Sequence, residues 1–76
     1  MLKELERVVL TTAMSSEGLE AGDVGTIVHV YRDGEAYEVE FVALDGHTTA
    51  VATLDATAVR PVSSRDMTHS REIQTV

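Results

Sequence analysis

The 76-residue chain contains no cysteine, no tryptophan, a single proline and a single lysine. Without cysteine it can form no disulfide and no thiolate zinc site. No apolar run approaches the roughly 20 residues that a membrane-spanning helix needs. Met1-Leu2-Lys3-Glu4 is followed by further charge and not by the apolar run of a signal peptide. These absences predict a cytoplasmic protein without membrane contact.

Positive charge is also scarce. Six Lys and Arg residues stand against thirteen Asp and Glu residues, for a net charge of −7. Affinity for nucleic acid comes largely from basic side chains on phosphates, so this balance argues against a nucleic-acid partner. An acidic surface keeps a small domain soluble, or it matches a basic protein partner, and the composition leaves both open.

The predicted fold is organised around a β-hairpin centred on Asp33-Gly34. Apolar runs flank this pair, and such a dipeptide favours a two-residue turn with Arg32 opposite Glu35. The register then fixes an inner side, made of Val30 with Tyr37, Val28 with Val39, and Thr26 with Phe41. The outer side carries Tyr31 with Ala36, His29 with Glu38, and Ile27 with Glu40. One side is apolar and the other charged, as a half-buried ribbon requires.

The rest of the chain reads as strands added to this hairpin. A second turn at Asp45-Gly46 predicts a strand over His47–Leu54, with Phe41 facing Ala50, Val39 facing Ala52 and Tyr37 facing Leu54. Before the hairpin we expect a short helical lead-in over 1–6, a strand over Arg7–Thr12, and a loop over Met14–Gly22 with Leu19 as a plug. Gly25 indicates a bulge or a close backbone contact. After the strand that ends at Leu54 we expect a helical turn over 55–57 and a closing strand over Ala58–Val62, with Pro61 at a sheet edge.

Five short strands predict an all-β fold, a small antiparallel SH3-like barrel over residues 1–62. Residues 63–76 are polar and lack a core pattern, so we expect a flexible, disordered tail. An inert tail and a partner-binding role for Ile73–Val76 are the two alternatives for this segment.

Three blocks carry a resemblance to a known family: Gly18 to Val28, Tyr37 to Phe41, and Arg60-Pro61. Over roughly residues 5–62 the chain resembles the small bacterial proteins of domain of unknown function 4926, a family with no established activity. The block Gly-Asp-Val-Gly-Thr-Ile-Val also looks like the KOW motif of SH3-like barrels, many of which bind RNA or the transcription machinery. Here Glu20, Asp23, Glu38 and Glu40 stand where such a binder would carry positive charge.

No catalytic, metal or cofactor constellation is predicted. His29, His47 and His69 are scattered by the expected topology, so neither a triad nor a metal site forms from them. His29 opposite Glu38 is interpreted as a cross-strand pair, with a weak acid–base dyad as the alternative. Glu38 and Glu40 are interpreted as a solvated strand face rather than an acid–base pair or calcium ligands.

Outward-facing apolar residues are the best functional lead. The register turns Ile27, Tyr31, Val42, Leu44 and Val51 outward beside Glu38 and Glu40, and an exposed apolar patch of this kind marks a protein contact. We therefore expect a non-enzymatic interaction module, such as an inhibitor, antitoxin or accessory subunit, that binds a basic protein or a second copy of itself. The predicted partner-binding residues are Ile27, His29, Tyr31, Glu38, Glu40 and Val51. A KOW-like nucleic-acid or ribosome-associated factor is the alternative, and a small enzyme or ligand-binding domain is the third.

Overall fold

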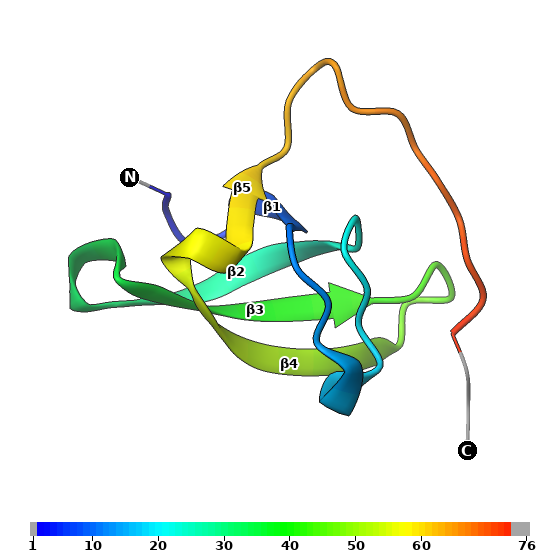
Figure 1. The fold of residues 1–76 in the computed structure, drawn as a ribbon, viewed down its shortest axis with the longest axis horizontal. Helices are drawn as coiled ribbons and strands as arrows, with labels where there is room; N and C mark the ends of the chain where they lie inside the picture. The colour runs from blue at the N-terminus through cyan, green and yellow to red at the C-terminus, as the bar shows by residue number, and fades with distance from the viewer. Residues whose placement is uncertain (1, 74–76) are drawn as a thin grey trace.

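A computed structural model describes residues 2–73 and shows one antiparallel sheet (Figure 1). Its elements follow in the order β1 Arg7–Leu10, η1 Ser15–Glu17, β2 Val24–Tyr31, η2 Arg32–Gly34, β3 Ala36–Val42, β4 Thr48–Asp55, η3 Ala56–Ala58 and β5 Val59–Pro61. The strand order is β4-β3-β2-β1-β5, with every neighbouring pair antiparallel. The all-β, five-stranded antiparallel fold is confirmed. The bent sheet stays open, because β4 and β5 form its two edges instead of pairing with each other.

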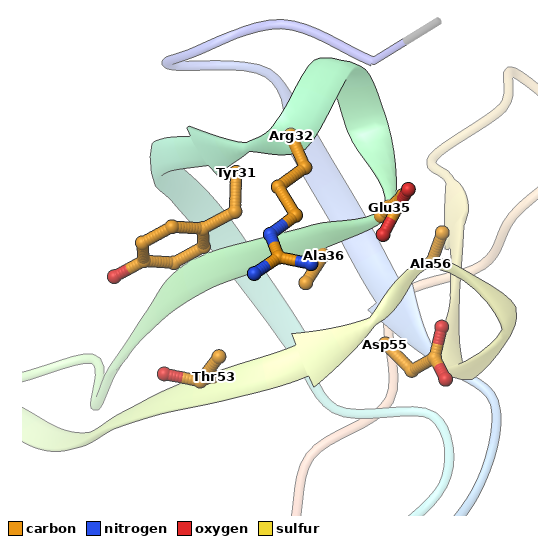
Figure 2. Close-up of a pocket in the computed structure, with 7 residues that line it drawn as sticks. All are labelled: Tyr31, Arg32, Glu35, Ala36, Thr53, Asp55 and Ala56. Carbon is orange, nitrogen blue, oxygen red and sulfur yellow. The ribbon is translucent and has the colours of Figure 1, made fainter.

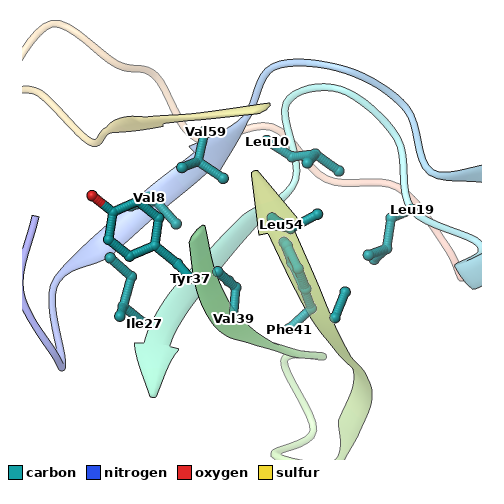
Figure 3. Packing of buried hydrophobic residues seen from close by; sticks show 10 residues of the cluster. Val8, Leu10, Leu19, Ile27, Tyr37, Val39, Phe41, Leu54 and Val59 are labelled. Atoms are coloured by element: carbon teal, nitrogen blue, oxygen red, sulfur yellow. The ribbon is translucent and has the colours of Figure 1, made fainter. Parts of the chain in front are cut away.

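The hydrophobic core lies on the inner side of the bent sheet (Figure 3). Its buried members are Val8, Leu10, Leu19, Ile27, Tyr37, Val39, Phe41, Ala52, Leu54 and Val59. Leu19 comes from the loop before β2 and is 2% exposed, so its predicted role as a plug is confirmed. Most other members alternate along their strands, as a sheet with one buried face requires.

The loop between β2 and β3 is wider than the predicted two-residue turn. Arg32, Asp33 and Gly34 all have positive φ, at 47°, 56° and 96°, and the Glu35 amide donates to the Tyr31 carbonyl at 3.1 Å. A two-residue turn would leave Arg32 extended and opposite Glu35. Here 32–35 form a four-residue loop instead, and the pairing begins at Tyr31 with Ala36. The register next to the loop, including Val30 with Tyr37 and His29 with Glu38, is as predicted.

A β-bulge at Val28 reverses the predicted orientation of the first half of β2. The register shifts between Ile27 and His29, so Ile27 pairs with Val39 and Thr26 with Glu40. The prediction that Val28 and Thr26 face inward and Ile27 outward is therefore wrong: Ile27 is 0% exposed, whereas Val28 is 39% exposed. The bulge places the larger apolar side chain in the core.

The bulge also turns Gly25 toward the core, where it approaches β3 closely. A Cβ atom at Gly25 would lie 2.5 Å from Val39 Cγ1 and 2.9 Å from the Glu40 carbonyl oxygen. Real Cβ atoms do not approach other atoms so closely, so a side chain at this position requires β2 or β3 to move. The predicted close backbone contact is confirmed.

The pairing of β3 with β4 follows the sequence closely. Phe41 faces Ala50, Val39 faces Ala52 and Tyr37 faces Leu54, as the Asp45-Gly46 turn predicts. A second register shift between Phe41 and Val42 leaves Thr49 as an extra residue, and β4 begins at Thr48 rather than His47.

Toward both ends of the chain, the structure differs from the predicted elements. The lead-in is a turn and not a helix. Leu5 has φ 71°, and the Glu6 amide donates to the Lys3 carbonyl. β1 ends at Leu10, and β5 is limited to Val59–Pro61. A partner-binding role is one predicted alternative for the segment 73–76. Residues 74–76 of this segment lie outside the described residues. Within 2–73, no helix is long and apolar enough to cross a membrane.

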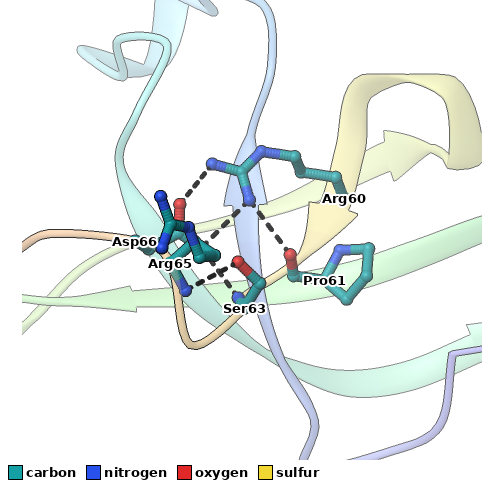
Figure 4. A network of polar contacts seen from close by, with 5 residues as sticks. All are labelled: Arg60, Pro61, Ser63, Arg65 and Asp66. Atoms are coloured by element: carbon teal, nitrogen blue, oxygen red, sulfur yellow. Dashed lines mark hydrogen bonds and ion pairs between the residues drawn. The ribbon is translucent and has the colours of Figure 1, made fainter.

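Two arginines connect the polar C-terminal segment to the sheet. Arg60 donates to both carboxylate oxygens of Asp66, at 3.0 and 2.7 Å, and to the Pro61 carbonyl (Figure 4). Arg71 donates to both carboxylate oxygens of Asp23, at 3.0 and 2.6 Å. These bonds hold the pKa values of both aspartates below the ordinary range. The chain after β5 thus returns to the start of β2.

Candidate functional site

The candidate site is the outer face of β2, β3 and β4, defined by His29, Tyr31, Glu38, Glu40, Val51 and Thr53. Three cross-strand rows build it. One row contains His29, Glu38 and Thr53. The next contains Thr26, Glu40 and Val51, and the third contains Tyr31, Ala36 and Asp55. Directly opposed residues of neighbouring strands point to the same side of a sheet, so these side chains share one surface.

Hydroxyl groups hold the two carboxylates of the outer face. The Tyr31 hydroxyl donates to Glu38 Oε1 at 2.7 Å, and the Thr48 hydroxyl donates to Glu40 Oε2 at 2.6 Å. The hydrogen bond to Glu38, followed by desolvation and the charge of Glu38, raises the pKa of Tyr31 above the ordinary tyrosine value. Each bond orients an oxygen without neutralising it.

Within residues 2–73, the cation–carboxylate contacts of up to 4.0 Å involve neither Glu38 nor Glu40. The basic side chains in those contacts bind carboxylates elsewhere, as Arg60 and Arg71 do. Both glutamates are half-buried. The outer face therefore presents two fixed negative charges whose Coulomb attraction is not used within the described part of the protein.

His29 does not form the predicted pair with Glu38. It lies opposite Glu38 in the register, but its Nδ1 is 4.0 Å from Glu4 Oε2 and its ring contacts Tyr31 edge-on, with centroids 4.4 Å apart. Glu38 instead accepts the Tyr31 hydroxyl. The histidine thus adds an aromatic edge and brings Glu4 to the border of the face.

Of the six predicted partner-binding residues, five lie together on the outer face and Ile27 does not. Ile27 is in the core because of the Val28 bulge, so its assignment to a binding surface is wrong. Val51 is 49% exposed beside Glu40. Val42 and Leu44 are exposed as predicted, at the end of β3 and in the following turn.

An open hollow continues the outer face toward the β2–β3 loop (Figure 2). It is lined by Tyr31, Arg32, Glu35, Ala36, Thr53, Asp55 and Ala56. The Arg32 side chain lies over β3 beside Tyr31. Glu35 comes from the β2–β3 loop, and Asp55 is the last residue of β4. This end of the face therefore mixes one cation with two further carboxylates.

A second histidine–carboxylate contact lies at the β3–β4 turn. His47 Nδ1 is 3.2 Å from Asp45 Oδ2, and the histidine side chain is 88% exposed. The His47 amide also donates to Asp45, and these two bonds hold the pKa of Asp45 below its ordinary value. The contact closes the turn. Among residues 2–73, no group of three His, Asp or Glu side chains is arranged to hold a metal ion.

Sequence reasoning missed Glu4, Thr48 and Val28 as contributors to the outer side. Thr48 approaches Glu40 because of the bulge at Thr49, and Val28 is exposed because of its own bulge. The adjacent apolar pair Ile27-Val28 was the available signal, since either residue could occupy the core position. No pattern in the lead-in indicates that Glu4 approaches His29.

Together, the bent five-stranded sheet and its acidic outer face define a small all-β domain. A family model for a domain of unknown function, DUF4926, matches residues 4–61. The chain belongs to this family, which confirms the resemblance seen in the three sequence blocks. Searches of curated proteins and of solved structures each find no matching protein.

Proposed function

We propose that this domain is a non-enzymatic interaction module that binds a basic protein through the outer face. The observation that carries the proposal is the pair Glu38 and Glu40, each oriented by a hydroxyl and neither in contact with a cation within residues 2–73. A partner's arginine or lysine would supply the missing charge. Charge-assisted hydrogen bonds to preoriented carboxylates are stronger than those between neutral groups.

The apolar residues around these carboxylates support a protein partner. Val28, Val42 and Val51 are 39%, 48% and 49% exposed, and Tyr31, whose hydroxyl donates to Glu38, is half-buried. Protein interfaces combine aromatic and apolar contacts at the centre with charged groups that set orientation. A net charge of −7 increases the association rate with a basic partner and disfavours phosphate backbones. An inhibitor, antitoxin or accessory subunit of the cytoplasm fits this description.

The test is partner capture from the source cell with matched charge variants. Glu38→Gln/Glu40→Gln keeps the hydroxyl acceptors and removes both charges of the outer face. The control, Glu17→Gln/Glu72→Gln, removes the same charge from η1 and from the C-terminal segment. A partner retained by the wild type and the control but lost by the outer-face variant supports the proposal. A partner retained equally by both variants contradicts it, as does salt-sensitive binding of RNA with micromolar or tighter affinity.

A further inference from the structure

The two edges of the sheet are protected very differently. β5 is three residues long and ends at Pro61, which has no amide hydrogen to donate. β4 is eight residues long, and from Thr48 to Leu54 it contains no charge and no proline. Natural sheets usually protect an edge with lysine, proline, charge or shortness, because an unprotected edge pairs with another strand. Among residues 2–73 no strand lies beyond β4 on the side away from β3, and only the loop that carries η1 lies beside its first residues, Thr48 and Thr49 (Figure 1).

The hydrogen-bond pattern identifies which groups of β4 face the free side. The Ala56 amide donates to the Glu35 carbonyl at 3.0 Å, which continues the β3–β4 register. Hydrogen-bonded and non-hydrogen-bonded pairs alternate in an antiparallel ladder, so Val51 and Thr53 direct their amide and carbonyl groups away from β3. Thr49 is the extra residue of the bulge and is not paired with β3. Val51 and Thr53 therefore supply backbone groups on the free side of β4.

The side chains of this edge are self-complementary. Residues 49–53 read Thr-Ala-Val-Ala-Thr, the same in both directions. We propose that two copies of the chain pair their β4 edges in antiparallel fashion, around a twofold axis at Val51. Val51 then faces the partner copy's Val51, and Thr49 faces the partner copy's Thr53. Such isologous pairing satisfies the same backbone groups in both copies.

Other registers and edges fit less well. In the Val51-centred register the nearest charged residue, Asp55, lies opposite His47, so no carboxylate opposes a carboxylate. Moving the axis to Thr53 places Asp55 opposite the exposed Val51, which is an unfavourable pair. Pairing β4 with β5 of another copy is limited by the three residues of β5 and by Pro61. A second copy bound edge to edge is therefore the best occupant of β4.

The dimer and the proposed partner binding depend on different groups, although Val51 lies in both surfaces. The dimer uses backbone groups of β4, whereas partner binding uses carboxylates of β3. The salt responses are also opposite. Added salt screens the repulsion between two copies of charge −7 and tightens the dimer, but it weakens a complex with a basic protein. Failure of one proposal therefore leaves the other in place.

Sedimentation velocity over a concentration series tests the pairing. The wild type should form a dimer, and Val51→Glu or Val51→Lys alone should raise the dimer dissociation constant at least about tenfold, because like charges meet at the axis. An equimolar mixture of these two variants should restore a dimer. Val62→Glu and Val62→Lys are matched controls, since Val62 is also a half-exposed valine but lies beyond β5. Urea unfolding checks that each variant is folded.

A cysteine cross-link tests the register directly, because the chain has no cysteine of its own. Under mild oxidation Val51→Cys should form a disulfide-linked dimer, since opposed residues lie about 5.5 Å apart between Cα atoms. Thr53→Cys should not, because the two copies of residue 53 would be about four residues, or roughly 14 Å, apart along the strand. A monomeric wild type, a dimer insensitive to charge at Val51, a mixture that stays monomeric, or equal cross-linking at both positions would each overturn the proposal.

Discussion

Replacing Ile27 or Val28 by alanine tests the bulge that determines the core. Ile27 is 0% exposed and packs in the core, so Ile27→Ala should lower the free energy of unfolding by about 2–5 kcal/mol. Val28 is 39% exposed, and Val28→Ala should cost about 1 kcal/mol or less. A domain of this size has a total stability of roughly 4–11 kcal/mol, so the first loss is severe. The midpoint of thermal unfolding should fall by at least about 8 °C for Ile27→Ala.

Urea unfolding followed by far-ultraviolet circular dichroism measures the difference. Ile27→Val serves as a milder variant that stays folded, with an expected loss of about 0.5–1.5 kcal/mol. If Val28→Ala costs as much as Ile27→Ala, or more, the register without a bulge is correct and the description of the inner side of β2 is refuted.

Three further predictions follow from single contacts. Gly25→Ala should cost about 1–3 kcal/mol in urea unfolding, because its Cβ collides with β3, and an unchanged midpoint would contradict the close approach. The pKa of Asp23 is lowered first by the Arg71 hydrogen bonds, so this contact stabilises the fold fully above the ordinary aspartate value of 3.8 and is lost as pH falls through the lowered value. In Arg71→Gln, the carboxyl resonance of Asp23 should titrate at higher pH than in the wild type, and identical titration curves would argue against the contact. Glu38→Gln should shift the absorbance titration of Tyr31 to lower pH, because the charge that opposes its ionisation is removed.

The sequence predicts most of the strand pairing. The Asp45-Gly46 turn and the alternation of Tyr37, Val39 and Phe41 fix the β3–β4 register, and the structure agrees at all three positions. The reason is physical: a one-residue slip would bury Glu38 and Glu40, which costs several kcal/mol. Where only one register keeps charge in water, the sequence is sufficient.

The two bulges could not be predicted in the same way. Ile27 and Val28 are adjacent and both apolar, so either can be buried without exposing a core residue or burying a charge. In the structure the bulge accompanies a close approach of Gly25 to Val39, a tertiary contact that the local sequence pattern does not specify. The composition of the outer face also depends on a bulge that the sequence does not predict. Residues from β2 and β3 were placed on it correctly, except Ile27, whereas Thr48 reaches Glu40 only through the bulge at Thr49.

The central functional claim is that Glu38 and Glu40 bind a basic protein. The most direct measurement is isothermal titration of the captured partner against the wild type and Glu38→Gln/Glu40→Gln, with Glu17→Gln/Glu72→Gln as the control of equal charge. We expect at least about a tenfold loss of affinity for the outer-face variant and little change for the control. Equal affinities for the two variants would contradict the claim.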